Sequence, residues 1–214
     1  MAKDKVHTVY KTKAGKRVPG VTTVLGVLAK PALIHWAWKL GCQGIDYKKY
    51  TDDKASIGTL AHAMILAHLK NEEPDTSDYS QNQISQAENS FLSFLEWEKG
   101  KKIEPEILET PIVDEEFEFG GTPDFIGVVD GIRTIMDFKT GSGIYEEMYY
   151  QLCAYEIAHF GNNPEKVSQQ GIILNIPRSE DESFQVKIFH DFVPGWDVFE
   201  ACLNIYNLRK EIKI

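Results

Sequence analysis

Two acidic residues and a lysine stand close together in the second half of the chain, in the segments Gly121-Thr122-Pro123-Asp124 and Asp137-Phe138-Lys139. A phosphodiester is anionic and resists attack by hydroxide, so its hydrolysis commonly uses a divalent cation held against the phosphate. Carboxylate oxygens are the ligands that Mg²⁺ prefers. These residues therefore predict a metal site in which Asp124 and Asp137 hold the ion, with a lysine beside it.

The lysine and the second acid are expected to share one face of a strand. The run from Arg133 to Lys139 has the residue types of a strand, in which successive side chains point to opposite faces. Asp137 and Lys139 then point the same way, while Phe138 points into the core. An ammonium group there could orient a water molecule, help to take its proton and offset charge on the phosphate. Alone, an Asp-x-Lys pair is common on solvated strands, and Gly-Thr-Pro-Asp is typical of a turn.

A helix is expected from Glu146 to His159, because this stretch has no Gly or Pro and is rich in helix-compatible residues. Gln151 and Tyr155 are four residues apart and therefore lie on one face of that helix. Their amide and phenol groups could hydrogen-bond a phosphate or brace the neighbouring strand. The sequence leaves both roles open.

A second helix is expected around Ser56–Met64, where Gly58 and His62 are also four residues apart. The glycine leaves room for a close approach, and the imidazole could bind a metal. A histidine beside Leu60 on an otherwise apolar helix is more often a satisfied core residue than a ligand. Its assignment therefore depends on the motifs that accompany it.

Taken together and in order, these motifs resemble the RecB-type branch of the PD-(D/E)XK nucleases, which includes phage exonucleases and CRISPR-associated nucleases. The opening segment from Tyr10 to Leu40 also resembles phage-encoded members of this group, although Gly20 stands where a serine is expected. The motifs that carry the resemblance, from Gly58 to Tyr155, are Gly58-x-x-x-His62, Gly121-Thr122-Pro123-Asp124, Asp137-x-Lys139 and Gln151-x-x-x-Tyr155.

The resemblance implies a role for each matching residue. His62, Asp124 and Asp137 would be metal ligands, and Phe138 would contribute its backbone carbonyl. Asp124, Asp137 and Lys139 would form the catalytic set. Substrate-binding residues would include the matching pair Gln151 and Tyr155.

The resemblance also implies the fold, the reaction and the cofactor. The fold would be α/β and restriction-endonuclease-like, with a central mixed sheet flanked by helices. The reaction would be hydrolysis of DNA that leaves 5′-phosphates, with Mg²⁺ as cofactor and Mn²⁺ able to substitute. Iron-sulfur members use four cysteines, whereas this chain has only Cys42, Cys153 and Cys202, so no such cluster is expected within it.

Several other residues allow two interpretations. Thr22 and Thr23 could donate to a DNA phosphate at the start of a helix, or could cap that helix. Glu109 could reach the metal, but exposed acids on strands are usually only solvated, so it is left out of the ligand set. Trp36 and Trp38 could stack on bases, although two tryptophans in a helix are more often packed in a core.

The remaining pattern alternates between helices and strands, which predicts the α/β class. A hairpin is expected from Val6–Tyr10 and Lys16–Val18, followed by a mostly helical segment at about 31–100 and a catalytic core at about 104–214. That helical segment is expected to break near 41–44 and 71–75, with a helix at 84–99. Further strands are expected at 106–113, 117–129, 132–140, 171–176 and 184–189, and a last helix at 198–211.

Composition sets outer limits. The 214 residues are 43% hydrophobic and show no internal repeat or low-complexity linker, so residues 1–214 are expected to form a single nuclease domain. A net charge of −9 argues mildly against nucleic acid, but the chain before Arg17 is basic, either as a DNA contact or as a solvated segment. Nothing resembles a signal peptide or a membrane span, and the cysteines are scattered, so a cytoplasmic location is expected.

The sequence thus predicts a Mg²⁺- or Mn²⁺-dependent DNA nuclease, an exonuclease rather than an endonuclease, that acts in recombination, repair or phage DNA metabolism. Its expected partner is DNA, single-stranded or with free ends, and a recombination or replication protein could bind it as well. The alternative is a catalytically silent nucleic-acid-binding or assembly module of the same fold. The presence of all three residues Asp124, Asp137 and Lys139 favours catalysis.

Overall fold

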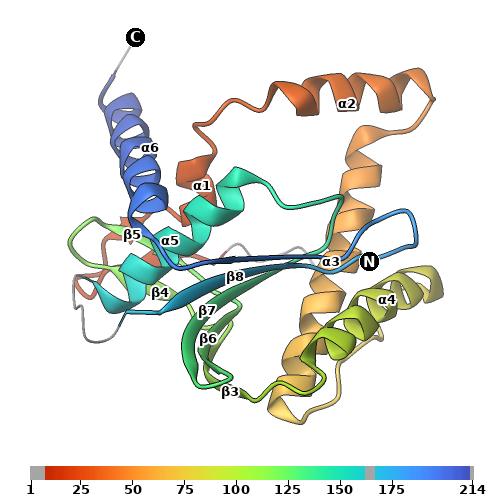
Figure 1. The fold of residues 1–214 in the computed structure, drawn as a ribbon. Coiled ribbons are helices and arrows are strands. Elements are labelled where there is room, and N and C mark those ends of the chain that lie inside the picture. The colour runs from red at the N-terminus through yellow and green to blue at the C-terminus, as the bar shows by residue number, and fades with distance from the viewer. Residues whose placement is uncertain (1–7, 162–166, 213–214) are drawn as a thin grey trace.

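The computed structural model describes residues 8–161 and 167–212 of the chain. A five-stranded mixed sheet with helices on both faces forms its centre, and a run of helices precedes that sheet in the chain (Figure 1). The expected α/β class is confirmed. The helices are α1 (Val21–Leu25), α2 (Pro31–Cys42), α3 (Tyr47–Lys70), α4 (Gln81–Glu98), α5 (Glu146–Phe160) and α6 (Val193–Glu211).

The central sheet has the order β3-β6-β7-β8-β9, and two small two-stranded sheets pair β1 with β2 and β4 with β5. Only β7 and β8 are parallel within the central sheet, and α5 connects them. The strands are β1 (Tyr10–Lys11), β2 (Arg17–Val18), β3 (Ile103–Leu108), β4 (Ile112–Asp114), β5 (Phe119–Gly121), β6 (Phe125–Val129), β7 (Ile132–Lys139), β8 (Gln170–Asn175) and β9 (Gln185–Phe189).

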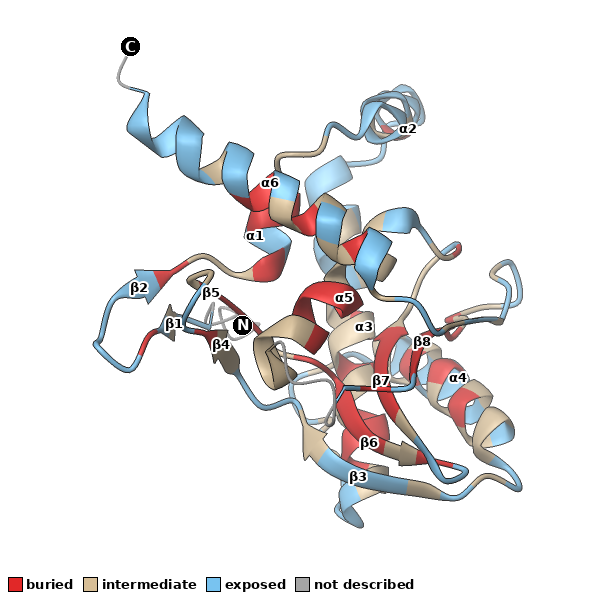
Figure 2. Cartoon of the chain, turned by 60° about the vertical axis from the view of Figure 1, so that its left-hand side comes forward, coloured by how far each residue is buried: buried red, intermediate tan, exposed pale blue. Residues whose placement is uncertain are grey.

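The core has two parts because side chains alternate along the central strands. Ile135 of β7 belongs to the cluster formed with α1, α5 and α6, whereas Met136 and Phe138 belong to the cluster formed with α3 and α4. Figure 2 shows this buried centre in β6, β7, β8 and α5. The expected inward direction of Phe138, which is fully buried, is therefore confirmed.

Local patterning predicted most elements to within a few residues. The hairpin is confirmed for its described residues, although Val6 and His7 lie outside them. At the start of α4, Ser80 and Gln83 form a capping box. The helical breaks are also confirmed, since α2 ends at Cys42 and α3 ends at Lys70.

Two expected strands were wrong in extent. The strand expected at 106–113 is two strands in different sheets, because the backbone at Glu109 turns with φ of 45°. The strand expected at 117–129 is interrupted between Gly121 and Phe125. Both interruptions fall at residues that belong to the site described below.

The two tryptophans of α2 are not packed in the core, although that was expected of them. Trp38 is exposed and stacks on His35, whereas Trp36 contacts the rings of Tyr47 and Tyr50 at the start of α3. Most of α2 is exposed in Figure 2, and its buried residue is Leu40. Apolar spacing alone did not show that this helix extends away from the sheet. Among the described residues, no helix is long and apolar enough to cross a bilayer.

Candidate active site

Three potential metal ligands meet where β3 ends beside the start of β6 in the central sheet. They come from three separate elements, namely His62 in α3, Glu109 directly after β3, and Asp124 just before β6. One ligand atom from each lies within 4.8 Å of the other two. The His62 Nδ1 atom lies 3.3 Å from the Asp124 Oδ1 atom. The group combines one imidazole nitrogen with carboxylate oxygens.

Asp124 is held in place by the strand next to it. Its Oδ2 atom accepts a hydrogen bond of 2.7 Å from the backbone N–H of Phe138. This bond joins the Thr122-Pro123-Asp124 interruption to β7. Asp124 is buried, so its second oxygen, directed at His62, is the one left for a ligand.

Asp137 and Lys139 share one face of β7, as their spacing predicted. Their side chains form an ion pair on the side of the sheet that α5 covers. The Lys139 Nζ atom donates to Gln151 Oε1 at 3.2 Å, and Gln151 Nε2 donates to the hydroxyl of Tyr155 at 2.7 Å. The four side chains therefore form one chain of polar contacts from Tyr155 on α5 to Asp137 on β7.

The electrostatics of the site place opposed charges in a buried space. Burial and the nearby Asp124 carboxylate raise the pKa of Asp137 to about 6, although Lys139 acts in the opposite direction. Burial alone would raise the pKa of Asp124, but His62, Lys139 and the Phe138 N–H together hold it below its usual range. For His62, burial lowers the pKa but the Asp124 carboxylate outweighs it, so the net shift is upward.

These residues fit a divalent cation. The Asp137 Oδ2 atom is buried and pairs with the Lys139 ammonium, while the charge of the nearby Asp124 carboxylate acts on the same residue. Uncompensated carboxylates in a buried space are stabilised by a cation. Carboxylate oxygens suit Mg²⁺ and Mn²⁺, and an imidazole nitrogen is better matched to the softer Mn²⁺.

Glu109 is the site residue that sequence reasoning left out. Its positive φ of 45° directs the chain away from the sheet and brings the carboxylate beside His62 and Asp124. Burial and the charge of Asp124 raise its pKa. Non-glycine residues with positive φ cluster at functional sites, but nothing in the sequence around Glu109 marks this backbone conformation.

A Glu109→Gln variant is expected to weaken Mn²⁺ affinity by about 10-fold or more, because an amide replaces a charged ligand. Calorimetric titration of the purified protein with Mn²⁺ would measure this. Glu104→Gln is the matched control, since that acid lies on β3 outside the group and pairs with Lys102. Equal affinities in the two variants would remove Glu109 from the ligand set.

Two glycines allow the helices to reach the site. A Cβ on Gly58 of α3 would lie 2.6 Å from the hydroxyl oxygen of Thr140, at the end of β7. A Cβ on Gly121 would lie 2.1 Å from a ring carbon of Tyr155. The Gly58-x-x-x-His62 and Gly121-Thr122-Pro123-Asp124 motifs therefore each include a glycine that sets a close contact.

Gly121→Ala is expected to destabilise the fold by about 1–3 kcal/mol, because the methyl group has to displace the buried Tyr155 ring. Urea unfolding would show a lower midpoint. Gly41→Ala in α2 is the control, since a Cβ there meets nothing within 4 Å. An unchanged urea midpoint for Gly121→Ala would contradict the close packing of Gly121 against the Tyr155 ring.

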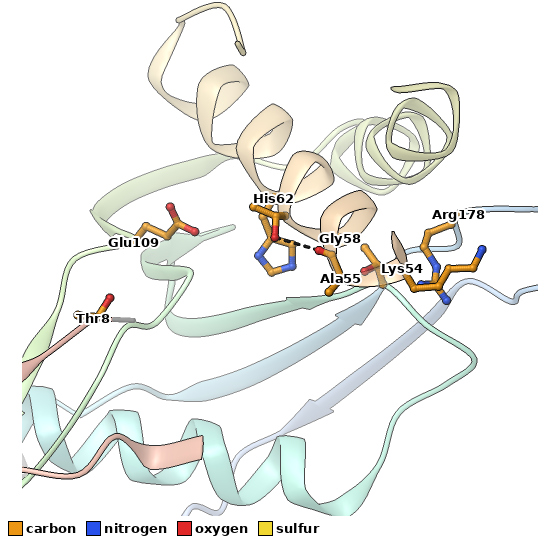
Figure 3. Close-up of a pocket in the computed structure, with 9 residues that line it drawn as sticks. Thr8, Lys54, Ala55, Gly58, His62, Glu109 and Arg178 are labelled. Carbon is orange, nitrogen blue, oxygen red and sulfur yellow. Dashed lines mark hydrogen bonds between the residues drawn. The ribbon is translucent and has the colours of Figure 1, made fainter. Parts of the chain in front are cut away.

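A cavity of about 640 Å³ opens onto the metal-ligand group, and His62 and Glu109 line it. Figure 3 shows His62 on α3 directed into this space, with Glu109 to one side of it. The other residues that line it are Thr8, Lys54, Ala55, Gly58, Thr59, Thr140 and Arg178.

The predicted substrate residues Thr22 and Thr23 lie elsewhere, in a second cavity of about 700 Å³ that Arg17 and Lys210 also line. Both threonines are exposed in α1, whose N-cap is Gly20 with no side-chain cap, so the helix-cap interpretation was wrong. Thr8 lines both cavities.

The N-terminal hairpin connects this region to the Gly-Thr-Pro-Asp segment. The Tyr10 hydroxyl lies 2.9 Å from Thr122 Oγ1, and the Tyr10 ring packs on Gly120, where a Cβ would lie 2.6 Å from it. The N-terminal motif and the acidic group are therefore parts of one packed structure.

Solved structures that resemble this chain have low sequence identity to it. No family model matches the chain, and no curated protein does either. Among solved structures, it is similar to a candidate exonuclease from Eubacterium rectale, with 12% identity, 73% of this chain and 69% of that chain covered, and a TM-score of 0.47. LHK-Exo, an alkaline exonuclease from Laribacter hongkongensis, in its complex with dAMP gives 13% identity, 71% and 77% coverage, and a TM-score of 0.39. At these values neither similarity assigns a function to this chain.

Proposed function

We propose that this chain is a divalent-metal-dependent DNA nuclease of the RecB-type branch of the PD-(D/E)XK group. One observation carries the proposal. His62, Glu109 and Asp124 come from three separate elements with ligand atoms within 4.8 Å of one another. The ion pair of Asp137 and Lys139 lies outside this group, but the charges of both residues interact with Asp124. This arrangement supports a metal site beside a cationic group, with Glu109 added to the residues that the sequence motifs predict.

The roles of the ligands follow from their chemistry. His62, Asp124, Asp137 and the Phe138 carbonyl hold the cation, and we add Glu109 to this set. A bound divalent cation polarises a phosphoryl oxygen and lowers the pKa of an attacking water. Burial of Asp124 and Asp137 excludes bulk water from these carboxylates and strengthens their interaction with cationic groups.

Lys139 orients the attacking water and offsets the charge that develops on the phosphate. The ammonium group is held from two sides, by Asp137 on its own strand and by Gln151 on α5. Tyr155 is buried and its hydroxyl accepts from Gln151, so this pair fixes the position of the lysine. Gln151 is only partly buried and can contact the substrate as well.

The product would be a 5′-phosphate, and the substrate a DNA strand with a free end. Thr22 and Thr23 would contact the DNA backbone in the second cavity, where Arg17 and Lys210 supply positive charge. Such contacts position a strand without reading its sequence. An exonuclease with these properties would serve recombination, repair or phage DNA metabolism, alone or with a recombination or replication protein.

The test is cleavage of end-labelled linear DNA, single- and double-stranded, with Mg²⁺, Mn²⁺ or EDTA, alongside a covalently closed circle. Loss of linear DNA that requires the metal, with circles spared, would support an exonuclease. Cleaved circles would make the protein an endonuclease. Binding without any cleavage would replace the proposal with the catalytically silent binding module.

A further inference from the structure

The cavity at the metal-ligand group has a second, basic end. Lys54 and Arg178 line the same cavity as His62 and Glu109. In Figure 3 these two cationic side chains lie beside each other at one end, Glu109 lies toward the other, and His62 lies between them. The cavity is therefore polarised, with ligands for a cation at one end and cations at the other.

Helix α3 sets the spacing between the two ends. Lys54, Gly58 and His62 are successive residues at intervals of four, so they share one face of the helix. Eight residues of α-helix rise about 12 Å. Gly58 lines the cavity between them, with the Thr140 hydroxyl packed against it, and Thr59 lines the cavity as well.

At this end of the cavity, Arg178 is paired with an acid and Lys54 is not, within the part of the chain that the structure describes. Arg178 is 9% exposed and donates through Nε and Nη2 to Glu182. Lys54 donates to the neutral amide of Gln86 at 3.0 Å, and among the described residues it forms no ion pair. Burial would raise the pKa of Glu182, but hydrogen bonds from Arg178 and the charges of Arg178 and Lys54 lower it. The charges of both Lys54 and Arg178 therefore act on the Glu182 carboxylate.

We propose that Lys54 and Arg178 bind a backbone phosphate of the strand that is cut, at a position away from the scissile phosphate. A spacing of about 12 Å corresponds to a few nucleotides, since a duplex strand rises about 3.4 Å per nucleotide. The DNA strand would follow the half-buried face of α3 that lines the cavity. This inference rests on the proposed nuclease function and adds a second phosphate contact to it.

Lys54→Gln is the variant that tests this inference. Arg178 is left in place, because removing it would leave the half-buried Glu182 carboxylate without its ion-pair partner. Fluorescence anisotropy would measure binding of a labelled single-stranded oligothymidylate, with Ca²⁺ in place of Mg²⁺, over a series of salt concentrations. Lys48→Gln is the matched control, since that exposed lysine lies on α3 outside the cavity and the charge change is the same.

The expected result is binding about fivefold weaker for Lys54→Gln than for Lys48→Gln at low salt. The slope of log affinity against log salt should also decrease by about 0.7, the value for one lost single-strand phosphate contact. A purely structural tie between Lys54 and Gln86 would lower the thermal midpoint but leave this slope unchanged, and that outcome would overturn the inference.

The two proposals fail in distinguishable ways. If the wild type cleaves DNA but Lys54→Gln and Lys48→Gln bind with the same affinity and slope, only the second phosphate site is wrong. If the wild type neither binds nor cleaves DNA under any metal, the nuclease function fails and the phosphate site fails with it.

Discussion

Replacing Asp124 with asparagine is expected to lower DNA cleavage by about 10³-fold or more and to remove measurable Mn²⁺ binding. The asparagine has nearly the same shape, and its carbonyl oxygen can still accept the hydrogen bond from the Phe138 N–H. It loses the charge that faces His62 and the cation. The variant therefore separates the ligand role of Asp124 from its role in connecting the Gly-Thr-Pro-Asp segment to β7.

Asp114→Asn is a suitable control for this experiment. Asp114 is also a buried acid that accepts backbone hydrogen bonds, from Glu116 at 2.9 Å and Phe117 at 2.6 Å, but it lies on β4 outside the metal-ligand group. The Asp114→Asn variant should cleave DNA at the rate of the wild type. Initial rates, calorimetric titration with Mn²⁺ and urea unfolding would be measured on both variants. Unchanged Mn²⁺ affinity in a folded Asp124→Asn protein would disprove the ligand assignment.

Lys139→Ala is expected to lower cleavage by about 10²- to 10⁴-fold, the range for loss of a positioned group that assists proton transfer or stabilises charge. The same substitution should not lower the affinity for Mn²⁺. Removal of the ammonium leaves the buried Asp137 carboxylate without its ion-pair partner, so a cation becomes the remaining way to compensate that charge. Mn²⁺ affinity should therefore be retained or increased.

This difference distinguishes a catalytic lysine from a structural one. Cleavage rates and Mn²⁺ titrations would be compared with those of Lys102→Ala, which removes an exposed lysine that lies directly before β3 and pairs with Glu104 at 3.1 Å. A Lys139→Ala protein that cleaves as fast as the wild type would show that the assignment is wrong. Loss of cleavage together with loss of metal affinity would show that Lys139 mainly maintains the shape of the site.

The overall negative charge of the chain is compatible with a nucleic-acid substrate because the charge is unevenly distributed around the site. Carboxylates gather where a cation would neutralise them, whereas Lys54, Arg178, Arg17 and Lys210 line the cavities beside them. A net charge of −9 describes the sum over the chain and not the field along the path of a strand. The salt dependence of DNA binding would measure that local field directly.

The sequence by itself determined the local geometry of the site. Alternation along a strand places Asp137 and Lys139 on one face with Phe138 on the other, because the side-chain period of a strand is two. Helical spacing places Gln151 near Tyr155, and their hydrogen bond of 2.7 Å agrees with it. These relations depend on neighbours within a few residues, which is why the pattern was sufficient to predict them.

Only the tertiary structure decided which distant residues meet. Glu109 joins His62 and Asp124 because the chain turns at a positive φ between β3 and β4, and no local signal in the sequence marks that turn. Thr22 and Thr23, which the sequence left as phosphate contacts or helix caps, line a different cavity from His62 and Glu109. The polarised cavity along α3 likewise requires Arg178, which follows β8, to pack against a helix that begins at Tyr47. Such contacts are set by how the helices pack on both faces of the sheet, and packing is a property of the whole chain that no short segment encodes.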